Sequence, residues 1–442
     1  MTISIEMFTF MMLGSLILLI VLGYPVAFVL GGLATIFGLI FVGPQVVNLF
    51  MLRIFGVMSD YILLAIPLFV FMGVIIEKSG LAGRLYDATY VIMGKVRGGL
   101  AIATLITCTI FAAATGVIGA SVVTMGLLAL PSMLRYKYDI PMATGAICAG
   151  GTLGILIPPS VMILVYGPLA GISVGKLFMA AFIPGLLLSG LFLAYVLIRC
   201  FLNPSLGPAM PPDHPDLNVP LSRKLYLFST SILPVGLLIL AVLGSIFFGV
   251  AAPTEAAGVG SLAAMLLALA YKQLTLQSLK ESLHSTMKIS CMIYLVMIGA
   301  GFFTAIFINQ GGGSVVSNLV LGLPLPNWGI LLVMFAIVFI MGAFIDWIGV
   351  VMIAVPLFTP IAAALGYDPL WFAMMFIVVM QTSFLTPPFA YAIFYLKGIA
   401  PPEVKTTHIY RGVVPFIVLQ FIGVILLAAF PQLITWLPSL MK

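Results

Sequence analysis

Two stretches of the sequence place short oxygen-bearing side chains directly before a pair of prolines. They are GTLGILIPPS, residues 151–160, and TSFLTPPF, residues 382–389. Proline lacks an amide donor and keeps the preceding residue out of a regular helix, so a helix unwinds there and frees backbone carbonyls. Free carbonyls and hydroxyls are ligands for a hard cation. The candidate cation ligands are Gly151, Thr152, Gly154, Thr382, Ser383 and Thr386, and the candidate substrate contacts are Pro159 and Pro388. The alternative is a pair of structural kinks, which membrane helices tolerate.

A third stretch, residues 108–126, has the composition of a helical hairpin with a small polar tip. Its middle reads ATGVIGAS and contains Thr115, Gly116 and Ser121. Non-helical backbone at membrane depth survives only inside protein or beside water, because every free amide and carbonyl needs a partner. Such a tip offers oxygens to a cation and helix N-termini to an anion. The alternative is that the small residues only let helices pack closely.

A fourth stretch, residues 341–356, carries Asp346, the only charged residue between Lys288 and Asp368. An ionised carboxylate inside a membrane costs several kcal/mol, so it usually faces a cavity, a partner or an ion. Asp is also a common helix cap. The two interpretations are compatible, and they make Asp346, with nearby Gly349, a candidate for both ion and substrate binding.

The composition predicts which kind of secondary structure positions these residues. Of 442 residues, 63% are hydrophobic and 7% are charged, whereas a soluble domain has about 25% charged residues. Long segments without charge, such as 230–250 and 291–308, predict an all-α polytopic membrane protein. The net charge of +6 is explained by basic cytoplasmic loops, so no nucleic-acid partner is predicted.

Enzymatic activity is not predicted. The four cysteines are scattered without a CxxC pair, and the triple glycine at 311–313 is not followed by the Lys-Ser/Thr of a phosphate loop. The sequence also lacks a paired carboxylate motif, an HExxH motif and a Ser/His set.

The chain divides into two halves that resemble each other. A Pro-rich linker at 203–222 separates residues 1–202 from residues 223–442. With a shift of 229 residues, Pro131 meets Pro360, Tyr138-Asp139 meets Tyr367-Asp368, and the two double prolines coincide. Both Asp residues precede a new helix and are expected to cap it. Paired halves with broken apolar segments at matching positions point to a transporter binding site.

The basic residues predict that the two halves are inverted. If 99–134 and 328–364 are re-entrant hairpins, 15 of the 18 Lys and Arg residues share one side, and Arg53, Lys176 and Lys442 lie opposite. The positive-inside rule makes the crowded side cytoplasmic, with both termini outside. Full crossing by both hairpins would remove much of this asymmetry.

At these residues the sequence resembles the large membrane subunit of tripartite ATP-independent periplasmic (TRAP) transporters. The resemblance rests on five phrases, in order along the chain: IPLFVFMGVIIEKSGLAGRL, GTLGILIPPS, AAPTEAAGVG, GAFIDWIGVVMIAVPLFTPI and LTPPFAYAIFYLKGIAP. It implies an inverted-repeat, elevator-type transporter with two re-entrant hairpins, two unwound helices and Na⁺ as coupling ion. It also implies a separate small four-helix membrane subunit, a periplasmic substrate-binding protein and a bacterial or archaeal inner membrane. Substrates in the family are mostly small carboxylates.

Two places differ from the common family pattern. The first hairpin tip reads Ala-Thr-Gly-Val-Ile-Gly-Ala-Ser where many members have a Ser-Gly-Ser-Ser-like tip. The second break is preceded by Met380-Gln381-Thr382-Ser383, where an acidic or Asn-containing pattern is common.

The sequence therefore predicts a Na⁺-coupled importer of a small carboxylate, with Na⁺ where each hairpin tip meets an unwound helix and substrate between the tips. Thr115, Gly116 and Ser121 are expected to face residues 151–154, and Asp346 and Gly349 to face residues 382–386. The alternative function is a passive channel or facilitator. A channel requires a continuous polar pore, whereas the intramembrane polar residues here cluster at two points.

Overall fold

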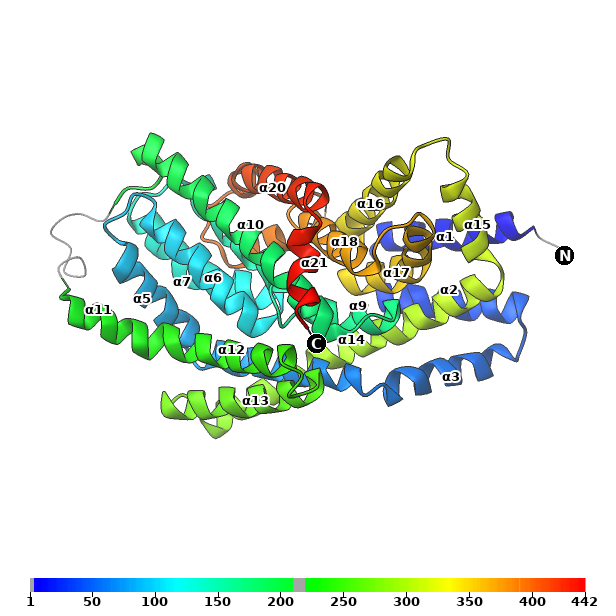
Figure 1. The fold of residues 1–442 in the computed structure, drawn as a ribbon, viewed down its shortest axis with the longest axis horizontal. Coiled ribbons are helices and arrows are strands. Elements are labelled where there is room, and N and C mark those ends of the chain that lie inside the picture. The colour runs from blue at the N-terminus through cyan, green and yellow to red at the C-terminus, as the bar shows by residue number, and fades with distance from the viewer. Residues whose placement is uncertain (1–3, 210–218, 389, 442) are drawn as a thin grey trace.

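The computed structural model describes residues 4–209, 219–388 and 390–441, and every regular element in these ranges is a helix (Figure 1). The helices of the first half are α1 Ile5–Val21, α2 Val26–Phe41, α3 Val46–Ser59, α4 Ala65–Lys78, α5 Leu81–Met93, α6 Gly99–Thr115, α7 Ile118–Arg135, α8 Ile140–Thr152, α9 Val161–Ala170 and α10 Val174–Leu202. Those of the second half are α11 Leu221–Leu227, α12 Leu233–Phe247, α13 Pro253–Ala270, α14 Leu276–Asn309, α15 Gly312–Leu321, α16 Asn327–Phe344, α17 Trp347–Ala364, α18 Pro369–Ser383, α19 Tyr391–Ile399, α20 Thr406–Ala429 and α21 Gln432–Ser439. Short 3-10 turns cover Ile62–Leu64, Leu153–Ile155 and Pro204–Leu206, and Phe228–Ile232 is a π-helical turn between α11 and α12.

The described residues include eight helices that are long and apolar enough to cross a membrane. The number rises to nine if α3 and the segment Ile62–Lys78, which meet at 58°, form one bent span. The prediction of an all-helical, multi-pass membrane protein is confirmed.

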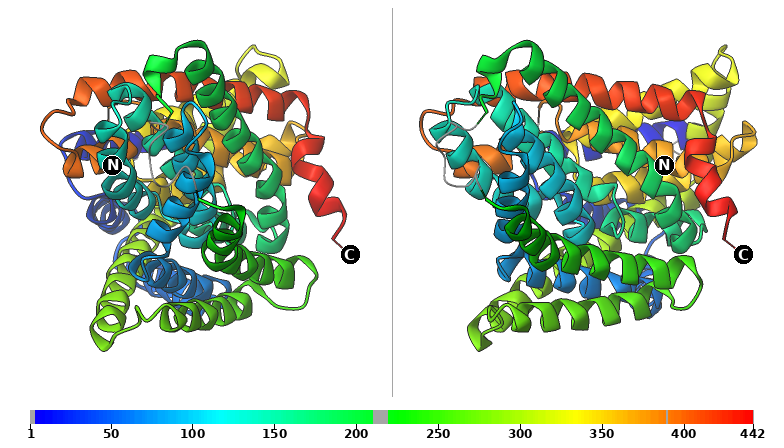
Figure 2. Two further views of the ribbon diagram at one scale, coloured as in Figure 1. Left: turned by 90° about the vertical axis from the view of Figure 1, so that its left-hand side faces the viewer. Right: turned by 60° about the vertical axis from the view of Figure 1, so that its left-hand side comes forward.

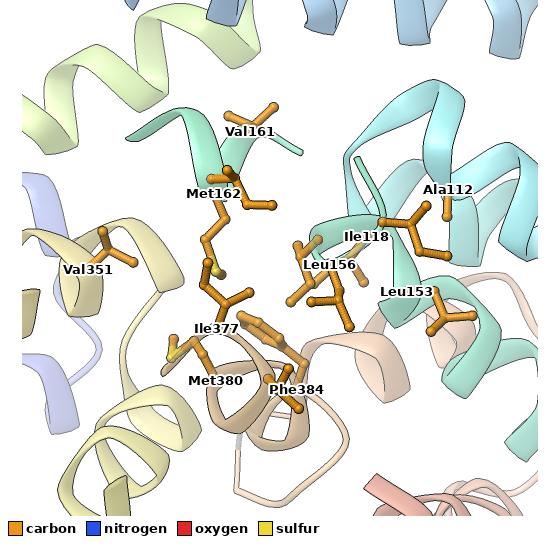
Figure 3. Close-up of a cluster of buried hydrophobic side chains, with 14 of the residues drawn as sticks. Ala112, Ile118, Leu153, Leu156, Val161, Met162, Val351, Ile377, Met380 and Phe384 are labelled. Carbon is orange, nitrogen blue, oxygen red and sulfur yellow. The ribbon is translucent and has the colours of Figure 1, made fainter. Parts of the chain in front are cut away.

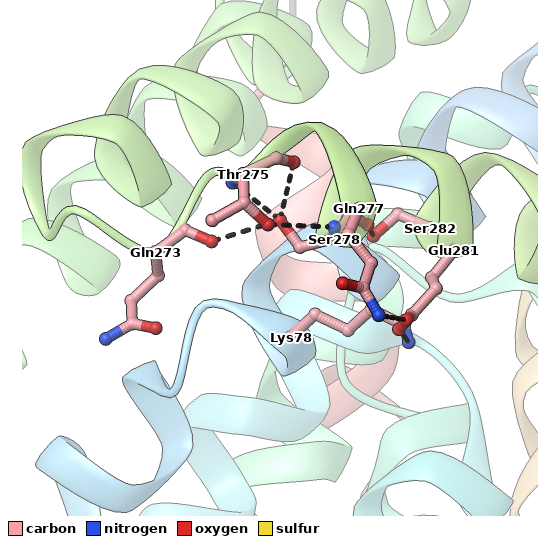
Figure 4. A network of polar contacts seen from close by, with 7 residues as sticks. All are labelled: Lys78, Gln273, Thr275, Gln277, Ser278, Glu281 and Ser282. Carbon is pink, nitrogen blue, oxygen red and sulfur yellow. Dashed lines mark hydrogen bonds and ion pairs between the residues drawn. The ribbon is translucent and has the colours of Figure 1, made fainter.

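A second group of helices packs beside the predicted hairpins, because α14 contacts α17, and α4 and α12 contact α6. Helix α14 packs against α2 and α4, and α13 packs against α4 and α12. In Figures 1 and 2, α13 runs along the side opposite α20. An exposed ion pair of 2.8 Å between Lys78 Nζ and Glu281 Oε2 joins the end of α4 to α14, close to the Thr275 cap that begins α14 (Figure 4).

The predicted hairpins are two helix pairs, α6 with α7 and α16 with α17. Both predicted breaks are present: α8 ends at Thr152 before α9 begins at Val161, and α18 ends at Ser383 before α19 begins at Tyr391. Proline accounts for each interruption because it cannot continue the hydrogen-bond ladder. Helices α7 and α17 both have 18 residues and begin 229 residues apart, as do α8 and α18 at positions 140 and 369.

The expected helix caps at the start of both broken helices are confirmed. Asp139 accepts a hydrogen bond from the Met142 amide at 3.1 Å, and Asp368 accepts one from the Trp371 amide at 2.8 Å. The two donors, like the two caps, are 229 residues apart. The same local chemistry therefore begins both broken helices.

Each broken helix packs against one hairpin before its break and against the other hairpin after it. Helix α8 packs against α6 and α7, but α9 packs against α17. Likewise α18 packs against α16 and α17, but α19 packs against α7 and α8. Each hairpin thus contacts segments from both halves of the sequence.

The predicted linker at 203–222 is partly described, since residues 210–218 lie outside the described ranges. Its first part is attached to the hairpin base, because Gly98 donates to the Gly207 carbonyl at 2.8 Å and Asp139 donates to the Leu206 carbonyl at 3.1 Å.

Candidate functional site

The tip of the first hairpin lies directly against the first break. Gly116 ends α6 with a φ of +63°, a left-handed conformation that favours glycine. A Cβ atom at this position would lie 2.7 Å from the Pro159 carbonyl oxygen. The absence of a side chain therefore allows the tip to approach a carbonyl of the unwound segment.

Two buried hydroxyl groups accompany this tip. The Oγ atoms of Thr115 and Ser121 are 3.1 Å apart, and they also donate to the Phe111 and Val117 carbonyls at 3.0 and 3.2 Å. A Cβ atom at Gly154 would lie 3.6 Å from Ser121 Oγ, so the break also approaches the hydroxyl pair. The structure thus brings Thr115, Gly116, Ser121 and Gly154 together.

The other two candidates of the first half lie elsewhere. Gly151 packs against Val122 on α7. Thr152 is fully buried, and its hydroxyl donates to the Ala149 carbonyl at 2.8 Å. The same hydroxyl oxygen accepts a hydrogen bond from Gln381 Nε2 of the second half, at 3.4 Å.

At the tip of the second hairpin, Asp346 has both of the features considered from the sequence. It caps α17, because Oδ2 accepts a hydrogen bond from the Ile348 amide at 3.2 Å. It also lines a cavity together with Trp347 and Ile348. Capping and lining the cavity are therefore compatible roles for this carboxylate.

The hydroxyls of the second break are directed to their own helix. Thr382, Ser383 and Thr386 donate to carbonyls three or four residues earlier, at 3.1, 2.6 and 3.0 Å. Ser383 Oγ also lies against Gly342 of α16, where a Cβ atom would overlap it. A hydroxyl that donates to a carbonyl still has lone pairs for a cation.

Gly349 does not face this break. A Cβ atom there would lie 3.0 Å from both Val26 on α2 and Ile345. The rotation of α17 about its axis, which could not be read from local sequence, directs Gly349 toward α2 instead of α18.

Both hairpin tips line a single cavity of about 90 Å³. The remaining walls come from residues that flank the two breaks and from one face of α14. The lining residues are Gly116, Val117, Ile118, Gly119, Ile155, Val161, Ile289, Met292, Ile293, Asp346, Trp347, Ile348, Phe384, Tyr391 and Tyr395. Elements far apart in the sequence therefore converge on one small space, in which Asp346 is the only charged lining residue among those that the structure describes.

The two proline candidates are not among these lining residues. Pro159 is buried beneath the first tip, whereas Pro388 is exposed. The whole first break, residues 151–160, is buried, but Pro387 and Pro388 of the second break reach the surface. The two breaks thus differ in accessibility although their helices begin at equivalent positions.

Four aromatic residues that line the cavity were not selected from the sequence: Trp347, Phe384, Tyr391 and Tyr395. The Phe384 and Tyr391 rings meet edge to face with centroids 5.7 Å apart. The Tyr395 ring lies 3.1 Å from the position of a Cβ atom at Gly119. Tyr395 lies 229 residues after Tyr166, the shift that relates the two halves, and this match was a usable signal for one of the four.

Apolar side chains fill the space between the breaks. Figure 3 shows Leu156 and Met162 from the first broken helix beside Ile377, Met380 and Phe384 from the second. The described residues contain no group of three or more His, Cys, Asp or Glu side chains that could hold a metal ion. A cation at this site would therefore depend on carbonyls, hydroxyls and Asp346.

The described helices define a multi-pass helical membrane protein. Solved structures agree on the fold: the YdaH transporter of Alcanivorax borkumensis has a TM-score of 0.62 and 16% identity, covering 95% of this chain and 98% of that one.

The family follows from sequence comparison. The model of the tripartite ATP-independent periplasmic transporter, DctM component, matches residues 13–433. The chain belongs to this family of large TRAP permease subunits. It is 32% identical to the C4-dicarboxylate TRAP transporter large permease protein DctM of Pseudomonas aeruginosa, over 92% of this chain and 93% of that protein. It is 30% identical to the sialic acid TRAP transporter large permease protein SiaM of Vibrio cholerae, over 95% of both. It is 32% identical to the ectoine/5-hydroxyectoine TRAP transporter large permease protein UehC of Ruegeria pomeroyi, over 86% of both.

Proposed function

We propose that this chain is the transmembrane permease of a Na⁺-coupled, binding-protein-dependent importer of a small organic acid. The observation that carries the proposal is the single cavity shared by both hairpin tips and by residues beside both breaks. Broken helices at the interface of two repeats are where transporters bind substrate and coupling ions. The named substrates of the relatives are C4-dicarboxylates, sialic acid and ectoines, which supports a small polar organic substrate, in our proposal a carboxylate.

In the proposed first ion site, Thr115, Gly116 and Ser121 offer oxygens to Na⁺ beside Gly154 and the Pro159 carbonyl. In the second, Asp346 acts with the hydroxyls that precede the second double proline. The substrate carboxylate then lies between the tips, and bound Na⁺ offsets its charge. Within the described part of the chain, no Lys, Arg or His lines the cavity, which is why a cation is assigned this role.

Transport is proposed to follow an elevator mechanism. The hairpins and broken helices move together past α2, α4, α13 and α14, which stay fixed with a separate small four-helix membrane subunit. A periplasmic binding protein delivers the substrate to the inner membrane. Ligands drive such a movement only if they bind its end states with different affinity.

The cavity in this structure belongs to an inward-facing state in our interpretation. It is lined by Ile289 and Tyr395, which lie close in sequence to Lys288 and Lys397. The charge distribution assigns both lysines to the cytoplasmic side, with both termini in the periplasm.

The test is uptake into proteoliposomes that contain this chain and its small subunit, with the binding protein outside. Accumulation should require both an inward Na⁺ gradient and the binding protein. It should fall strongly with Asp346→Ala and with the double substitution Thr382→Ala and Ser383→Ala. A passive facilitator would instead equilibrate substrate without Na⁺. Uptake unaffected by these variants and by removal of Na⁺ would overturn the proposal.

A further inference from the structure

A direct contact joins the two broken helices at equivalent positions. Gln381 lies in the last turn of α18, and Thr152 is the last residue of α8. Both side chains are fully buried, and Gln381 Nε2 donates to Thr152 Oγ1 at 3.4 Å. The two positions are 229 residues apart, the shift that relates the two halves. Each half thus contributes the same position to one shared contact.

The C-terminal ends of two helices lie at this contact. The C-terminal end of a helix carries about half a negative charge and leaves carbonyls without intrahelical donors. Two such ends, those of α8 and α18, meet here. No Lys, Arg or His is among the buried residues that the structure describes, so no buried cationic side chain offsets this potential.

One strong acceptor at the contact is unused. Gln381 Oε1 is buried and has no hydrogen-bond partner among the described residues. Leaving a buried polar group unpaired is costly, so such a group in a native structure calls for a ligand or another explanation. An amide carbonyl oxygen is a suitable ligand for a hard cation and cannot itself donate a hydrogen bond.

We propose that Gln381 Oε1 is a ligand in a third, central site for a monovalent cation, shared by the two halves and supported by the Thr152 hydroxyl. This inference rests on the proposed Na⁺-coupled function and reassigns Thr152 from the first tip site to the central site. Neither residue lines the cavity between the hairpin tips, so the central site is separate from it. Because both broken helices supply it, cation binding there couples the two halves.

The experiment is a Na⁺ titration of the thermal unfolding midpoint of the purified chain in lipid nanodiscs. Choline replaces Na⁺ at constant ionic strength, and neither substrate nor binding protein is added. Wild-type protein should show a saturable rise of the midpoint. Gln381→Leu should raise the half-saturating Na⁺ concentration about tenfold or more, since a polar contact to a charged group is lost. Gln381→Glu keeps an oxygen at this place and should not raise it.

Two similar threonines on α8 can be compared to test whether the Thr152 hydroxyl is a Na⁺ ligand or has only a structural role. Thr152 and Thr144 are both buried on α8, and each donates to a carbonyl of its own helix at 2.8 Å. Thr152→Val should raise the half-saturating Na⁺ concentration, whereas Thr144→Val should leave it unchanged. If Gln381→Leu fails to fold, the comparison of Thr152→Val with Thr144→Val still shows whether the central site binds Na⁺.

The outcomes separate the two proposals. If wild-type protein shows no Na⁺-dependent rise and its uptake does not require Na⁺, the Na⁺-coupled function itself is wrong. If wild-type protein responds to Na⁺ but Gln381→Leu and Thr152→Val respond with the same half-saturation, only the central site is wrong.

Discussion

Replacing Gly116 with alanine tests whether the approach of the first tip to the first break matters for ion binding. The added Cβ would lie 2.7 Å from the Pro159 carbonyl oxygen, and ordinary van der Waals contact begins at 3.4 Å. The tip or the carbonyl must therefore move by about 0.7 Å. Ion–ligand distances in a metal site tolerate only about 0.2 Å, so a displacement of this size should remove the carbonyl from an ion site.

The substitution also has a conformational cost that must be separated from this effect. Alanine in a left-handed conformation costs roughly 1–2 kcal/mol. Gly171, the cap at the end of α9, offers a matched control, since its φ is +66° and no atom lies within 4 Å of an added Cβ. Gly171→Ala therefore has the backbone cost without the displacement.

The assay is Na⁺-dependent uptake in proteoliposomes with the small subunit and binding protein, normalised to folded protein, beside thermal unfolding of each variant. Both variants should lose stability, but only Gly116→Ala should require at least about tenfold more Na⁺ for half-maximal uptake, a change of about 1.4 kcal/mol. Equal Na⁺ requirements in the two variants would refute the assignment of the Pro159 carbonyl to an ion site.

Three further predictions concern individual side chains. Asp346→Asn keeps the α17 cap, so the unfolding midpoint should stay close to that of wild type. The Na⁺ concentration required for half-maximal uptake should rise. An unchanged Na⁺ requirement would limit Asp346 to a capping role. Asp368→Ala should lower the free energy of unfolding by about 1 kcal/mol without changing the Na⁺ requirement, because this residue only caps α18; a changed requirement in uptake assays would contradict this. Lys78→Ala removes an exposed ion pair and should change the free energy of unfolding by less than about 1 kcal/mol, so a large drop in the unfolding midpoint would be inconsistent with the exposed geometry.

Much of the site's architecture could be predicted because it depends on local chemistry. Proline cannot continue a helix, so the double prolines located both breaks. The Asp residues before Pro141 and Pro369 predicted the helix caps, and Asp346 could be singled out by its isolation in an apolar segment, with capping as one of its two compatible roles. These features need only a few consecutive residues.

Other parts of the site depend on how helices rotate and pack, which the local sequence does not specify. Gly349 lies against α2 because of the rotation of α17, and Pro388 is exposed while Pro159 is buried. The contact between Thr152 and Gln381 joins residues of different halves. The shift of 229 residues contained the signal for that contact, since it makes the two positions equivalent, but equivalence alone does not imply proximity.

The most direct test of the central claim is equilibrium binding of radioactive sodium to the purified chain in nanodiscs. The account predicts saturable binding, weakened by both Gly116→Ala and Asp346→Asn but not by Gly171→Ala. Absence of saturable binding, or binding that both tip variants leave unchanged, would contradict the claim that the hairpin tips and the unwound helices form cation sites.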